Sequence, residues 1–537
     1  MKISRLAVEN HARLENFDLA VHDHLVLVGA NDVGKSSLLR CLDFALGATT
    51  AQLYARITRA DFRDPAEPLV IEVGFQHLTA DDIRLFPDEV HVGASAEDRS
   101  LTVRLSATLE LEETLTISRT APDGRTNRQL TRDQVAGLGW RFLSATAQTR
   151  DLQDGRRSAL DELLRAVDLG AERAAFDKIA ESLGTQLADS TVLGDLRSTL
   201  ADQLSRALPE QIEKDDLVFT PGAAADDDVL SDVRLQVSKN GASRDLAAQS
   251  DGTRALFAIA LYDLMSAGAN VVGIDEPEVH LHPTSQRSLA RLLRANPNQK
   301  VIATHSPDIV GAFEPDSIVV VRPGGRVVKP QRGFLSDDDR MVVRWWVRDR
   351  LEPLTARRVV AVEGLSDRII LERIAEVTGR QLDRIGVSLL EVGGSGDMGP
   401  IEKLFGDQGF QIPMSRLIDA DAADQVSREL GVDRDELPSK SVWVSDADLE
   451  DEYVRALGAE TAWAAIRDSG QFDGGELALC SPDGAVPTLE SIASFCRNKK
   501  ARGRKVKAAL AVMSSFNTEN SRGVESIEKL LGEVAGA

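Results

Sequence analysis

Alternating apolar and polar residues mark the first strands of the chain. The stretches I-S-R-L-A-V-E-N and L-E-N-F-D-L-A-V alternate as half-buried antiparallel strands do, and L-V-I-E-V-G-F and L-T-V-R-L-S-A-T-L-E-L repeat the pattern. Between them L-V-L-V, which follows His24, is continuously apolar, which favours a buried strand. It passes through glycines into a helical pattern. The pattern predicts an N-terminal α/β domain.

The apolar period changes between residues 156 and 208. There S-A-L-D-E-L-L-R-A-V and L-R-S-T-L-A-D-Q-L-S-R-A-L place apolar residues three and four apart, which predicts amphipathic helices. The acidic T-P-G-A-A-A-D-D-D that follows predicts a loop. We therefore expect a helical insertion, residues 151–225, between two parts of one domain, residues 1–150 and 226–335.

A second domain boundary is expected near R-P-G-G-R at residues 322–326. After it, Ser336 followed by three aspartates is a good N-cap for a helix through W-W-V-R-D-R-L. Strand-sized apolar runs follow in R-R-V-V-A-V, S-L-L-E-V, R-L-I and V-W-V. Residues 336–537 are therefore predicted to form a second α/β domain.

Length and charge limit the number of domains and the kind of binding surface that can be expected. A chain of 537 residues exceeds what one hydrophobic core normally organises. A net charge of −22 argues against a surface that binds nucleic acid everywhere, although a local basic groove remains compatible with it. The run from Arg497 to Lys507 has seven basic residues and no acid. On composition alone, a solvated helix face explains such a run better than DNA contact does.

No apolar run approaches the roughly 20 residues that span a bilayer, so we expect no membrane helix. The first ten residues carry charges and no apolar core, so we expect no signal peptide and a cytoplasmic protein. The three cysteines, Cys41, Cys480 and Cys496, are too widely spaced to suggest zinc or a disulfide framework. They are expected to be small buried residues.

The segment Gly29 to Ser36, G-A-N-D-V-G-K-S, matches G-x-x-x-x-G-K-[ST] in full. In such a loop the backbone N–H groups and the following helix terminus face phosphates. Lys35 is expected to reach the β- and γ-phosphates and the Ser36 hydroxyl to ligate Mg²⁺. Asn31, Gly34 and Ser37 complete the predicted ATP contacts, and a chance glycine-rich turn is the weaker explanation.

A second segment, V-V-G-I-D-E-P-E-V-H-L-H-P, supports ATP binding. Its buried strand would deliver Asp275 to the metal, while Glu276 would polarise the attacking water. In V-I-A-T-H-S-P-D, His305 follows another apolar strand and would sense the γ-phosphate. A lone histidine is more often structural, so this role depends on its context.

These segments resemble the ABC-type ATPase heads of the SMC, RecF and OLD (overcoming lysogenization defect) proteins. In such heads a Ser-Gly-Gly signature of one subunit closes over the ATP of another, and Q-S-D-G-T-R, Gln249 to Arg254, stands in the corresponding place. Ser250 and Gly252 fit that role as predicted nucleotide contacts, whereas Asp251 departs from the double glycine. The chain has no long heptad region for an SMC arm.

Acidic residues follow the strands of the C-terminal third. Glu363 ends one strand with Asp367 in the next helix, and R-L-I-D-A-D places Asp419 and Asp421 two residues apart. In an extended segment both would face one cation, Mg²⁺ or Mn²⁺. For D-A-D alone, acids that cap helices or bind ordinary loops are the better explanation. Asp424 is expected to cap the following helix. The ordered set E-G, G-G and D-x-D resembles the TOPRIM fold of topoisomerases, primases and OLD nucleases, and this favours the metal site.

An ATPase head joined to a TOPRIM domain is the architecture of OLD nucleases, including the nuclease subunit of Gabija phage-defence systems. The resemblance implies ATP-linked DNA cleavage with two metals per nuclease site. Glu450, preferred over Asp446 and Asp448, would serve the second metal. It also implies a catalytic lysine, for which Lys505 is chosen over Lys500 and Lys507, and it favours DNA contact by the basic run. A homodimer or larger assembly held by the helical insertion, and a separately encoded helicase-like partner, are further expectations. The alternative is a DNA-repair or sensor ATPase whose TOPRIM-like domain binds DNA or a partner without cleaving.

Overall fold

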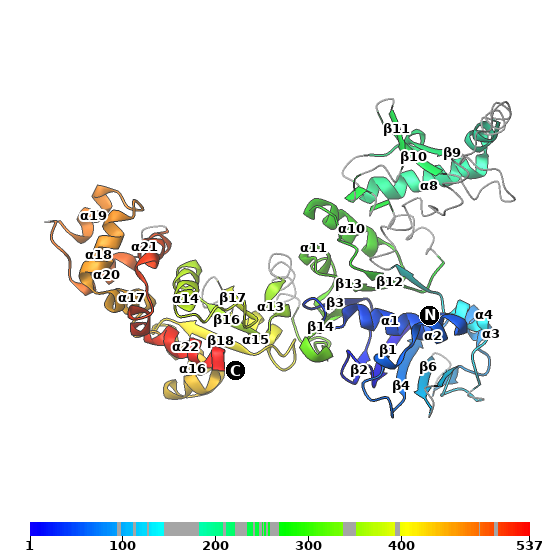
Figure 1. The fold of residues 1–537 in the computed structure, drawn as a ribbon, viewed down its shortest axis with the longest axis horizontal. Coiled ribbons are helices and arrows are strands. Elements are labelled where there is room, and N and C mark those ends of the chain that lie inside the picture. The colour runs from blue at the N-terminus through cyan, green and yellow to red at the C-terminus, as the bar shows by residue number, and fades with distance from the viewer. Residues whose placement is uncertain are drawn as a thin grey trace. The chain divides into compact units, whose positions relative to one another are not determined.

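The computed structural model forms two compact units. The main part of the N-terminal unit is Met1–Lys329, and that of the C-terminal unit is Glu352–Ala537 (Figure 1). The described residues are 1–93, 98–110, 114–125, 128–143, 182–207, 211–220, 234–239, 242–245, 250, 252–253, 256–257, 268–336, 351–392, 398–482, 484–498 and 503–536. The helix expected after Ser336 lies outside these residues.

The first sheet of the N-terminal unit is antiparallel, as the alternating pattern predicts. Its strand order is β2-β1-β4-β6-β5, and β7 pairs with the remaining part of β6. These strands are β1 (Lys2–Glu9), β2 (Phe17–Ala20), β4 (Leu69–Gln76), β5 (His91–Val92), β6 (Arg99–Leu109) and β7 (Leu115–Thr120). One face of this sheet is buried because every second residue of β4 and β6 points into the core.

The second sheet of the N-terminal unit is parallel except at one edge. Its order is β15-β14-β3-β13-β12-β8, with only β15 antiparallel to its neighbour. The strands are β3 (Leu25–Val28), β8 (Trp140–Leu143), β12 (Val271–Asp275), β13 (Gln299–Ala303), β14 (Ile318–Val321) and β15 (Val327–Val328). Continuous apolar runs such as β3 are buried throughout, as expected for a strand covered on both faces.

Helix α1 (Lys35–Leu46) packs against both sheets. It buries Leu38, Leu42 and Phe44 in one core with β4, β6 and β13. The other α-helices among the described residues of this unit are α2 (Thr50–Arg56), α3 (Ala80–Leu85), α4 (Arg132–Gly137), α8 (Thr191–Ala207), α10 (Pro283–Ala295) and α11 (Pro307–Val310). Since α1 begins immediately after the glycine-rich loop, the core fixes the position of that loop.

The described part of the expected helical insertion contains helices followed by strands. Residues 182–189 and α8 are helical, as the period predicts. Strand β9 (Leu217–Thr220) then pairs with β10 (Arg234–Lys239), which pairs with β11 (Ala242–Asp245). A small antiparallel sheet thus follows α8, and β9 lies within residues predicted to be helix and loop. The predicted helix at residues 158–167 is outside the described residues.

The C-terminal unit is built on a parallel sheet of order β17-β16-β18-β19. Its strands are β16 (Arg358–Val362), β17 (Val387–Glu391), β18 (Met414–Ile418) and β19 (Val442–Val444). All four were predicted from apolar runs, and the structure confirms them. The carboxyl ends of parallel strands lie at one edge of a sheet, where ligands of such folds bind.

Helices complete the C-terminal unit. They are α13 (Glu352–Thr355), α14 (Leu365–Val377), α15 (Met398–Phe405), α16 (Ala423–Leu430), α17 (Leu449–Leu457), α18 (Ala459–Asp468), α19 (Gly474–Cys480), α20 (Leu489–Cys496), α21 (Arg504–Val512) and α22 (Glu525–Gly536). The core joins α14, α17 and α21 to one face of the sheet through Val360, Val362 and Leu417. On α22, Glu533 accepts hydrogen bonds from Ser441 and Trp443. This helix therefore holds β19 by polar contacts.

The helices and the cysteines bear on two expectations from the sequence. None of the described helices is long and apolar enough to cross a membrane. Cys41 and Cys496 are buried, as expected, whereas Cys480 is only half-buried, and all three thiols are free. The expectation that all three are buried is therefore wrong for Cys480, which follows the exposed Leu479 at the end of α19.

Candidate nucleotide and metal sites

The loop from Gly29 to Ser36 joins β3 to α1, and two of its glycines are sterically required. Gly34 has a φ of 115°, a region that favours glycine. A Cβ there would lie 2.8 Å from Cδ2 of Leu14. At Gly29 a Cβ would collide with the carbonyl oxygen of Val321 in β14. The close wrapping of a phosphate loop is therefore built into this segment.

Lys35 is buried at the start of α1. Its Nζ donates hydrogen bonds to the carbonyl oxygens of Gly29, at 3.0 Å, and Ala30, at 2.8 Å. Burial lowers the pKa of Lys35, while the nearby Glu276 and Asp275 act in the opposite direction. A phosphate at this loop would compensate the buried ammonium better than two carbonyl dipoles do.

Ser36 and Asp275 are brought together from opposite ends of the domain sequence. The Ser36 hydroxyl donates to Oδ1 of Asp275 at 3.1 Å. Burial raises the pKa of Asp275, and the hydrogen bond from Ser36 opposes that change. A hydroxyl and a carboxylate at the end of a buried strand are oxygen ligands suited to Mg²⁺. These residues, together with Lys35, fit the expected ATP and Mg²⁺.

Glu276 and His305 face each other across the ends of β12 and β13. His305 Nε2 lies 3.6 Å from Oε1 of Glu276. Burial, followed by repulsion from Lys35, lowers the pKa of His305, which favours the neutral imidazole. Glu276 has a φ of 47°, an uncommon backbone conformation for glutamate. Glu276, predicted to polarise the attacking water, and His305, predicted to sense the γ-phosphate, therefore both lie near the ammonium of Lys35.

Glu278 is a residue of this site that the sequence argument missed. Its carboxylate accepts a hydrogen bond from the backbone N–H of His305, and burial raises its pKa. It holds the segment that carries His305 against the end of β12. The available signal was the E-P-E spacing, which puts a second acid two residues beyond Glu276.

The remaining predicted nucleotide contacts are more open. Asn31 and Ser36 are exposed, and Ser37 is half-buried. Ser250 is exposed, and its hydroxyl accepts a hydrogen bond from the Thr253 N–H at 3.3 Å. At Gly252 a Cβ would lie 2.7 Å from the His280 carbonyl oxygen. Asp251, which differs from the first glycine of the Ser-Gly-Gly signature, lies outside the described residues.

In the C-terminal unit, three carboxylates meet at the carboxyl edge of the sheet. Glu363 follows β16, and Asp419 and Asp421 follow β18. One oxygen from each of these three side chains lies within 4.8 Å of the other two. The predicted extended geometry of D-A-D is wrong, because Asp419 begins a turn in which its carbonyl accepts from the Ala422 N–H at 3.1 Å. The turn, rather than a strand, brings Asp421 back to Asp419.

Asp419 is the most connected member of this cluster. Its backbone N–H donates to Oε1 of Glu363 at 3.1 Å. Its Oδ1 accepts from the Leu449 N–H at 3.1 Å, and its Oδ2 lies 3.4 Å from Nζ of Lys505. Burial raises the pKa of Asp419, while Lys505 opposes that change. The side chain is thus fixed by β16, α17 and α21 together.

Asp367, Glu450 and Lys505 lie beside the first three acids. Glu450 is 1% exposed, and its Oε2 lies 3.0 Å from Nζ of Lys505. Burial raises the pKa of Glu450 to about 7, although Lys505 lowers it. Oδ2 of Asp367 accepts from the Gly364 N–H at 3.0 Å, and burial, then Asp419, raises its pKa. The structure therefore places all six predicted residues of this site at one end of the sheet.

The balance of charge in the cluster favours added cations. Burial raises the pKa of Glu363, and repulsion from Asp419 raises it further. The only ammonium near these acids in the described part of the chain is that of Lys505. Carboxylates crowded in this way are stabilised by a hard divalent ion, whose preferred ligands are oxygens. The donor set fits Mg²⁺ or Mn²⁺.

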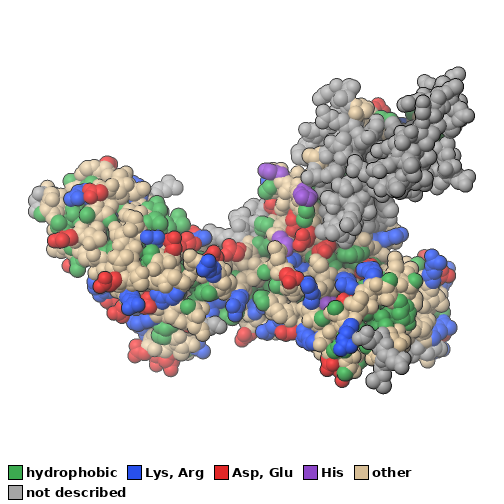
Figure 2. Space-filling view, viewed as in Figure 1, with side chains coloured by type: hydrophobic (Ala, Val, Ile, Leu, Met, Phe, Trp, Pro, Cys, Tyr) green, Lys and Arg blue, Asp and Glu red, His purple; other side chains and the backbone are tan. Residues whose placement is uncertain are grey.

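The basic run of residues 497–507 is largely occupied by ion pairs within the unit. Arg497 lies 2.9 Å from Asp448, and Arg504 lies 3.1 Å from Glu476, to which Lys507 also comes within 3.6 Å. The residues at 499–502, including the alternative Lys500, lie outside the described part. On the face shown in Figure 2, basic and acidic side chains are likewise intermixed over the described surface. Lys505, rather than Lys507, reaches the acids.

Three further acids, Asp424, Asp446 and Asp448, lie at helix starts or in ion pairs outside the metal cluster. Asp424 was expected to cap the following helix, and this is wrong. The N-cap of α16 is Ala422, and Asp424 lies exposed in its first turn. Asp448 caps α17 by accepting from the Asp451 N–H at 2.8 Å, and Asp446 is exposed and pairs with Arg455. Glu450 is therefore the buried acid among these neighbours.

Known families match both units. The family described as "AAA domain, putative AbiEii toxin, Type IV TA system" matches residues 25–311, more than half of the chain. The family described as "Overcoming lysogenization defect protein-like, TOPRIM domain" matches residues 354–421. The chain belongs to the AAA-domain family and carries an OLD-like TOPRIM domain. This AAA–TOPRIM architecture confirms the predicted fold class and the predicted resemblance to OLD proteins.

Two curated relatives match about three quarters of the AAA–TOPRIM chain. "Endonuclease GajA" of Bacillus cereus (strain VD045) is 22% identical over 441 residues, which cover 74% of this chain and 71% of the relative. "OLD nuclease" of Thermus scotoductus (strain ATCC 700910 / SA-01) is 24% identical over 425 residues, covering 73% and 77%. The relatives and the two domains confirm the prediction of a hydrolase that combines an ATPase domain with an endonuclease domain.

Two solved structures are similar to parts of the chain. The SMC head bound to the C-terminal winged-helix domain of ScpA is 17% identical and covers 64% of this chain and 100% of that chain, with a TM-score of 0.42. The C-terminal region of the Burkholderia pseudomallei OLD protein is 23% identical and covers 33% and 96%, with a TM-score of 0.28. The TOPRIM match ends at residue 421, so the positions of Glu450 and Lys505 rest on the geometry above.

Proposed function

We propose that the AAA–TOPRIM protein is an ATP-regulated, divalent-metal-dependent endonuclease that nicks or cleaves the phosphodiester bonds of DNA. The observation that carries the proposal is the cluster of Glu363, Asp419 and Asp421, with oxygens within 4.8 Å of one another at the carboxyl edge of a TOPRIM-type sheet. The names of two relatives, an endonuclease and a nuclease, support the same activity. A role in phage defence is a further proposal from the same similarity.

Each residue of the cluster has a proposed task. Glu363, Asp419 and Asp421 hold one divalent ion, and Asp367 and Glu450 help to hold a second beside Asp419. Two such ions, when bound, supply an activated water and stabilise the leaving 3′-oxygen of the phosphodiester. Lys505, already directed at Asp419 and Glu450, donates to the charge that develops on the phosphate.

The N-terminal unit is proposed to bind ATP and to regulate cleavage. Lys35 and Ser36 hold the phosphates and Mg²⁺ with Asp275, and Glu276 orients the attacking water beside the neutral His305. Ser250 and Gly252 are proposed to contact the ATP of a second copy of the chain. A homodimer or larger assembly is therefore part of the proposal, as is a separately encoded helicase-like partner.

The decisive experiment is plasmid cleavage by the purified protein. Supercoiled DNA is incubated with Mg²⁺ or Mn²⁺, each without nucleotide, with ATP and with a non-hydrolysable ATP analogue. We expect metal-dependent conversion to nicked or linear DNA, loss of cleavage with EDTA, and a rate that changes with nucleotide. The double variant Glu363→Ala/Asp419→Ala is the control for contaminating nuclease.

Two outcomes would contradict the proposal. Cleavage that persists in the double variant would remove the TOPRIM cluster from the chemistry. ATP hydrolysis and DNA binding without cleavage, under every metal and nucleotide, would instead favour a sensor or repair ATPase whose TOPRIM domain only binds. Nucleotide binding by the double variant must equal that of the parent protein, since Glu363 and Asp419 lie outside the nucleotide site.

A further inference from the structure

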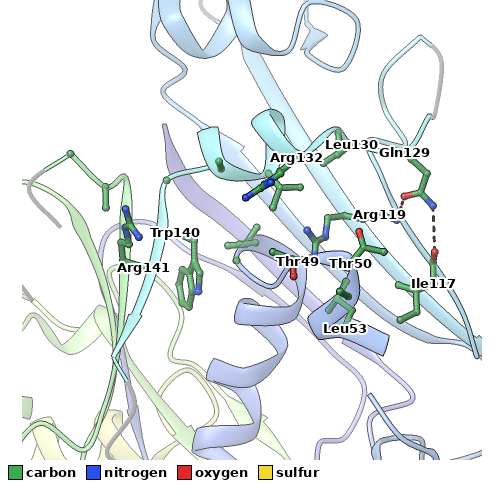
Figure 3. A pocket seen from close by; sticks show the side chains of 18 residues that line it. Thr49, Thr50, Leu53, Ile117, Arg119, Gln129, Leu130, Arg132, Trp140 and Arg141 are labelled. Atoms are coloured by element: carbon green, nitrogen blue, oxygen red, sulfur yellow. Dashed lines mark hydrogen bonds between the residues drawn. The ribbon is translucent and has the colours of Figure 1, made fainter. Parts of the chain in front are cut away.

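The N-terminal unit has a hollow at the end of α1 that is farther from the phosphate loop. Its cavity volume is about 1010 Å³, and Figure 3 shows side chains that line it. Leu46 and Gly47 at the end of α1, the start of α2, strand β7, helix α4 and strand β8 contribute to its lining. A helix of 12 residues is roughly 18 Å long. The hollow is therefore separate from the site at Lys35.

The charge of this hollow differs from that of the chain. The described residues that line it include three arginines, Arg119, Arg132 and Arg141, and no aspartate, glutamate or lysine. They come from β7, α4 and β8. In Figure 3, Arg119 and Arg132 lie on one side of Trp140 and Arg141 lies on the other. Since the chain has 85 acidic and 63 basic residues, a lining of this kind is unlike its average surface. An anion would be the complementary ligand.

Arg119 is the buried member of the three. It is 6% exposed, and its Nη2 donates to the carbonyl oxygens of Phe44, at 2.6 Å, and Ala48, at 2.7 Å. Burial lowers its pKa to about 10, which Asp43 opposes. Within the described part of the chain, no carboxylate lies within ion-pair distance of it, and its buried Nε has no hydrogen-bond partner.

A purely structural role explains only part of this arrangement. Lone carbonyls at a helix C-terminus attract a cation, so Arg119 stabilises the end of α1. That role uses Nη2 and leaves the buried Nε without a partner. It also does not explain why Arg132 and Arg141, both exposed, lie around the same hollow without an ion pair to any described residue. Burying an unpaired charge costs free energy that a bound anion would offset.

We propose that this hollow binds a phosphorylated small molecule of nucleotide size. Guanidinium groups match phosphate oxygens in geometry and charge, and three of them suit a ligand with more than one negative charge. A volume of about 1010 Å³ is far larger than one phosphate ion and lies at the upper end of ligand pockets. The side chains of Leu53, Ile117 and Trp140 line the hollow as well, and they offer an apolar surface to the uncharged part of the ligand.

Binding is tested in the full-length Lys35→Ala variant, in which the phosphate loop is weakened. Isothermal titration calorimetry is performed with ATP, with inorganic tripolyphosphate and with adenosine. We expect ATP and tripolyphosphate to bind. The double variant Arg132→Glu/Arg141→Glu, made in the same background, should lower both affinities at least tenfold. The matched control is Arg125→Glu, because Arg125 is an exposed arginine of the same unit that does not line the hollow.

Comparing ATP with tripolyphosphate distinguishes recognition of a whole nucleotide from recognition of its phosphates alone. Tighter binding of ATP than of tripolyphosphate indicates a nucleotide, and equal binding indicates that the phosphates alone are recognised. No binding of either probe, or binding that the double variant leaves unchanged, overturns the proposal. Binding of a 5′-phosphorylated oligonucleotide with no binding of ATP also overturns it, in favour of DNA.

Arg132 and Arg141 are exposed, so their substitution is not expected to unfold the protein. The variant Arg132→Gln/Arg141→Gln repeats the test without charge reversal. DNA cleavage is not measured, so the result is independent of the proposed nuclease activity.

Discussion

The two sites place a lysine beside strand-end carboxylates, yet the lysines have opposite surroundings. Lys35 donates to two carbonyl oxygens of its own loop, and the nearby Asp275 is bound by a hydroxyl. Lys505 lies within 3.4 Å of two carboxylates, and further acids surround them. The first site has a buried cation that an anionic ligand would satisfy. The second has excess negative charge that cations would satisfy.

The largest effect is expected for Asp419→Asn, which removes the most connected carboxylate and keeps its shape. Plasmid cleavage should fall at least about 1000-fold, as on loss of a central catalytic group. ATP affinity should not change, because Asp419 belongs to the other unit. Asp424→Asn is the matched control, since this nearby acid is exposed in α16. Cleavage within tenfold of the parent protein would show that the cluster is not the catalytic centre.

The next effect separates Lys505 from its neighbour in the basic run. Lys505→Met should lower the cleavage rate about 100-fold, the size seen when one donor to a developing charge is lost. Lys507→Met should leave the rate nearly unchanged, because Lys507 pairs with Glu476 rather than with the cluster. Initial rates of plasmid nicking at saturating Mn²⁺ measure both variants. Equal losses would indicate that the basic run acts through DNA contact.

Lys35→Ala tests the other side of the comparison. Loss of a charge-assisted contact to phosphate should weaken ATP binding at the loop by roughly 10- to 100-fold. The stabilisation of the C-terminal unit by Mn²⁺, followed as a change in Tm without nucleotide, should stay the same. Lys2→Ala is the control, because Lys2 is a half-buried lysine of β1 whose Nζ lies 3.7 Å from Asp23. A lost Mn²⁺ response would mean that the sites are not independent.

The smallest effect is a pH dependence at the metal cluster. The folded-state pKa of Glu450 is about 7, above the ordinary 4.5. Ionising it therefore costs stability in the metal-free protein as pH rises from about 4.5 to beyond 7. A divalent ion needs the ionised form, so the rise in Tm caused by Mn²⁺ should be larger at pH 8 than at pH 6. In Glu450→Gln this difference should shrink, and an unchanged difference would contradict the assignment.

The sequence predicts the strands and the order of chemical segments well, because both depend on local patterns. Continuous apolar runs become the buried β3, β12, β16 and β18, and the acids at their ends are visible in the sequence. The glycine-rich loop is also predictable from a short segment, because the motif fixes the backbone positions that must be glycine.

Features that depend on distant contacts were harder to predict. Ion pairing of Arg497 and Arg504 with acids of α17 and α19 cannot be seen in a run of basic letters. The turn at Asp419 and the N-cap at Ala422 were misjudged because an aspartate suits both a cap and a helix first turn. Strand β9 comes after the segment whose apolar spacing predicts helices. Its pairing with β10 is a tertiary contact, which that local pattern does not contain.

The parallel pairing of β16 and β18 has a consequence for how the cluster tolerates change. Glu363 and Asp419 follow neighbouring strands of one ladder, and neighbouring strands are about 4.8 Å apart in any sheet. The spacing of the two backbone positions is therefore a property of the strand pairing, which substitutions in surrounding loops do not alter. Sequence changes in the loops around the site can thus accumulate while the backbone spacing that carries its central acids is kept.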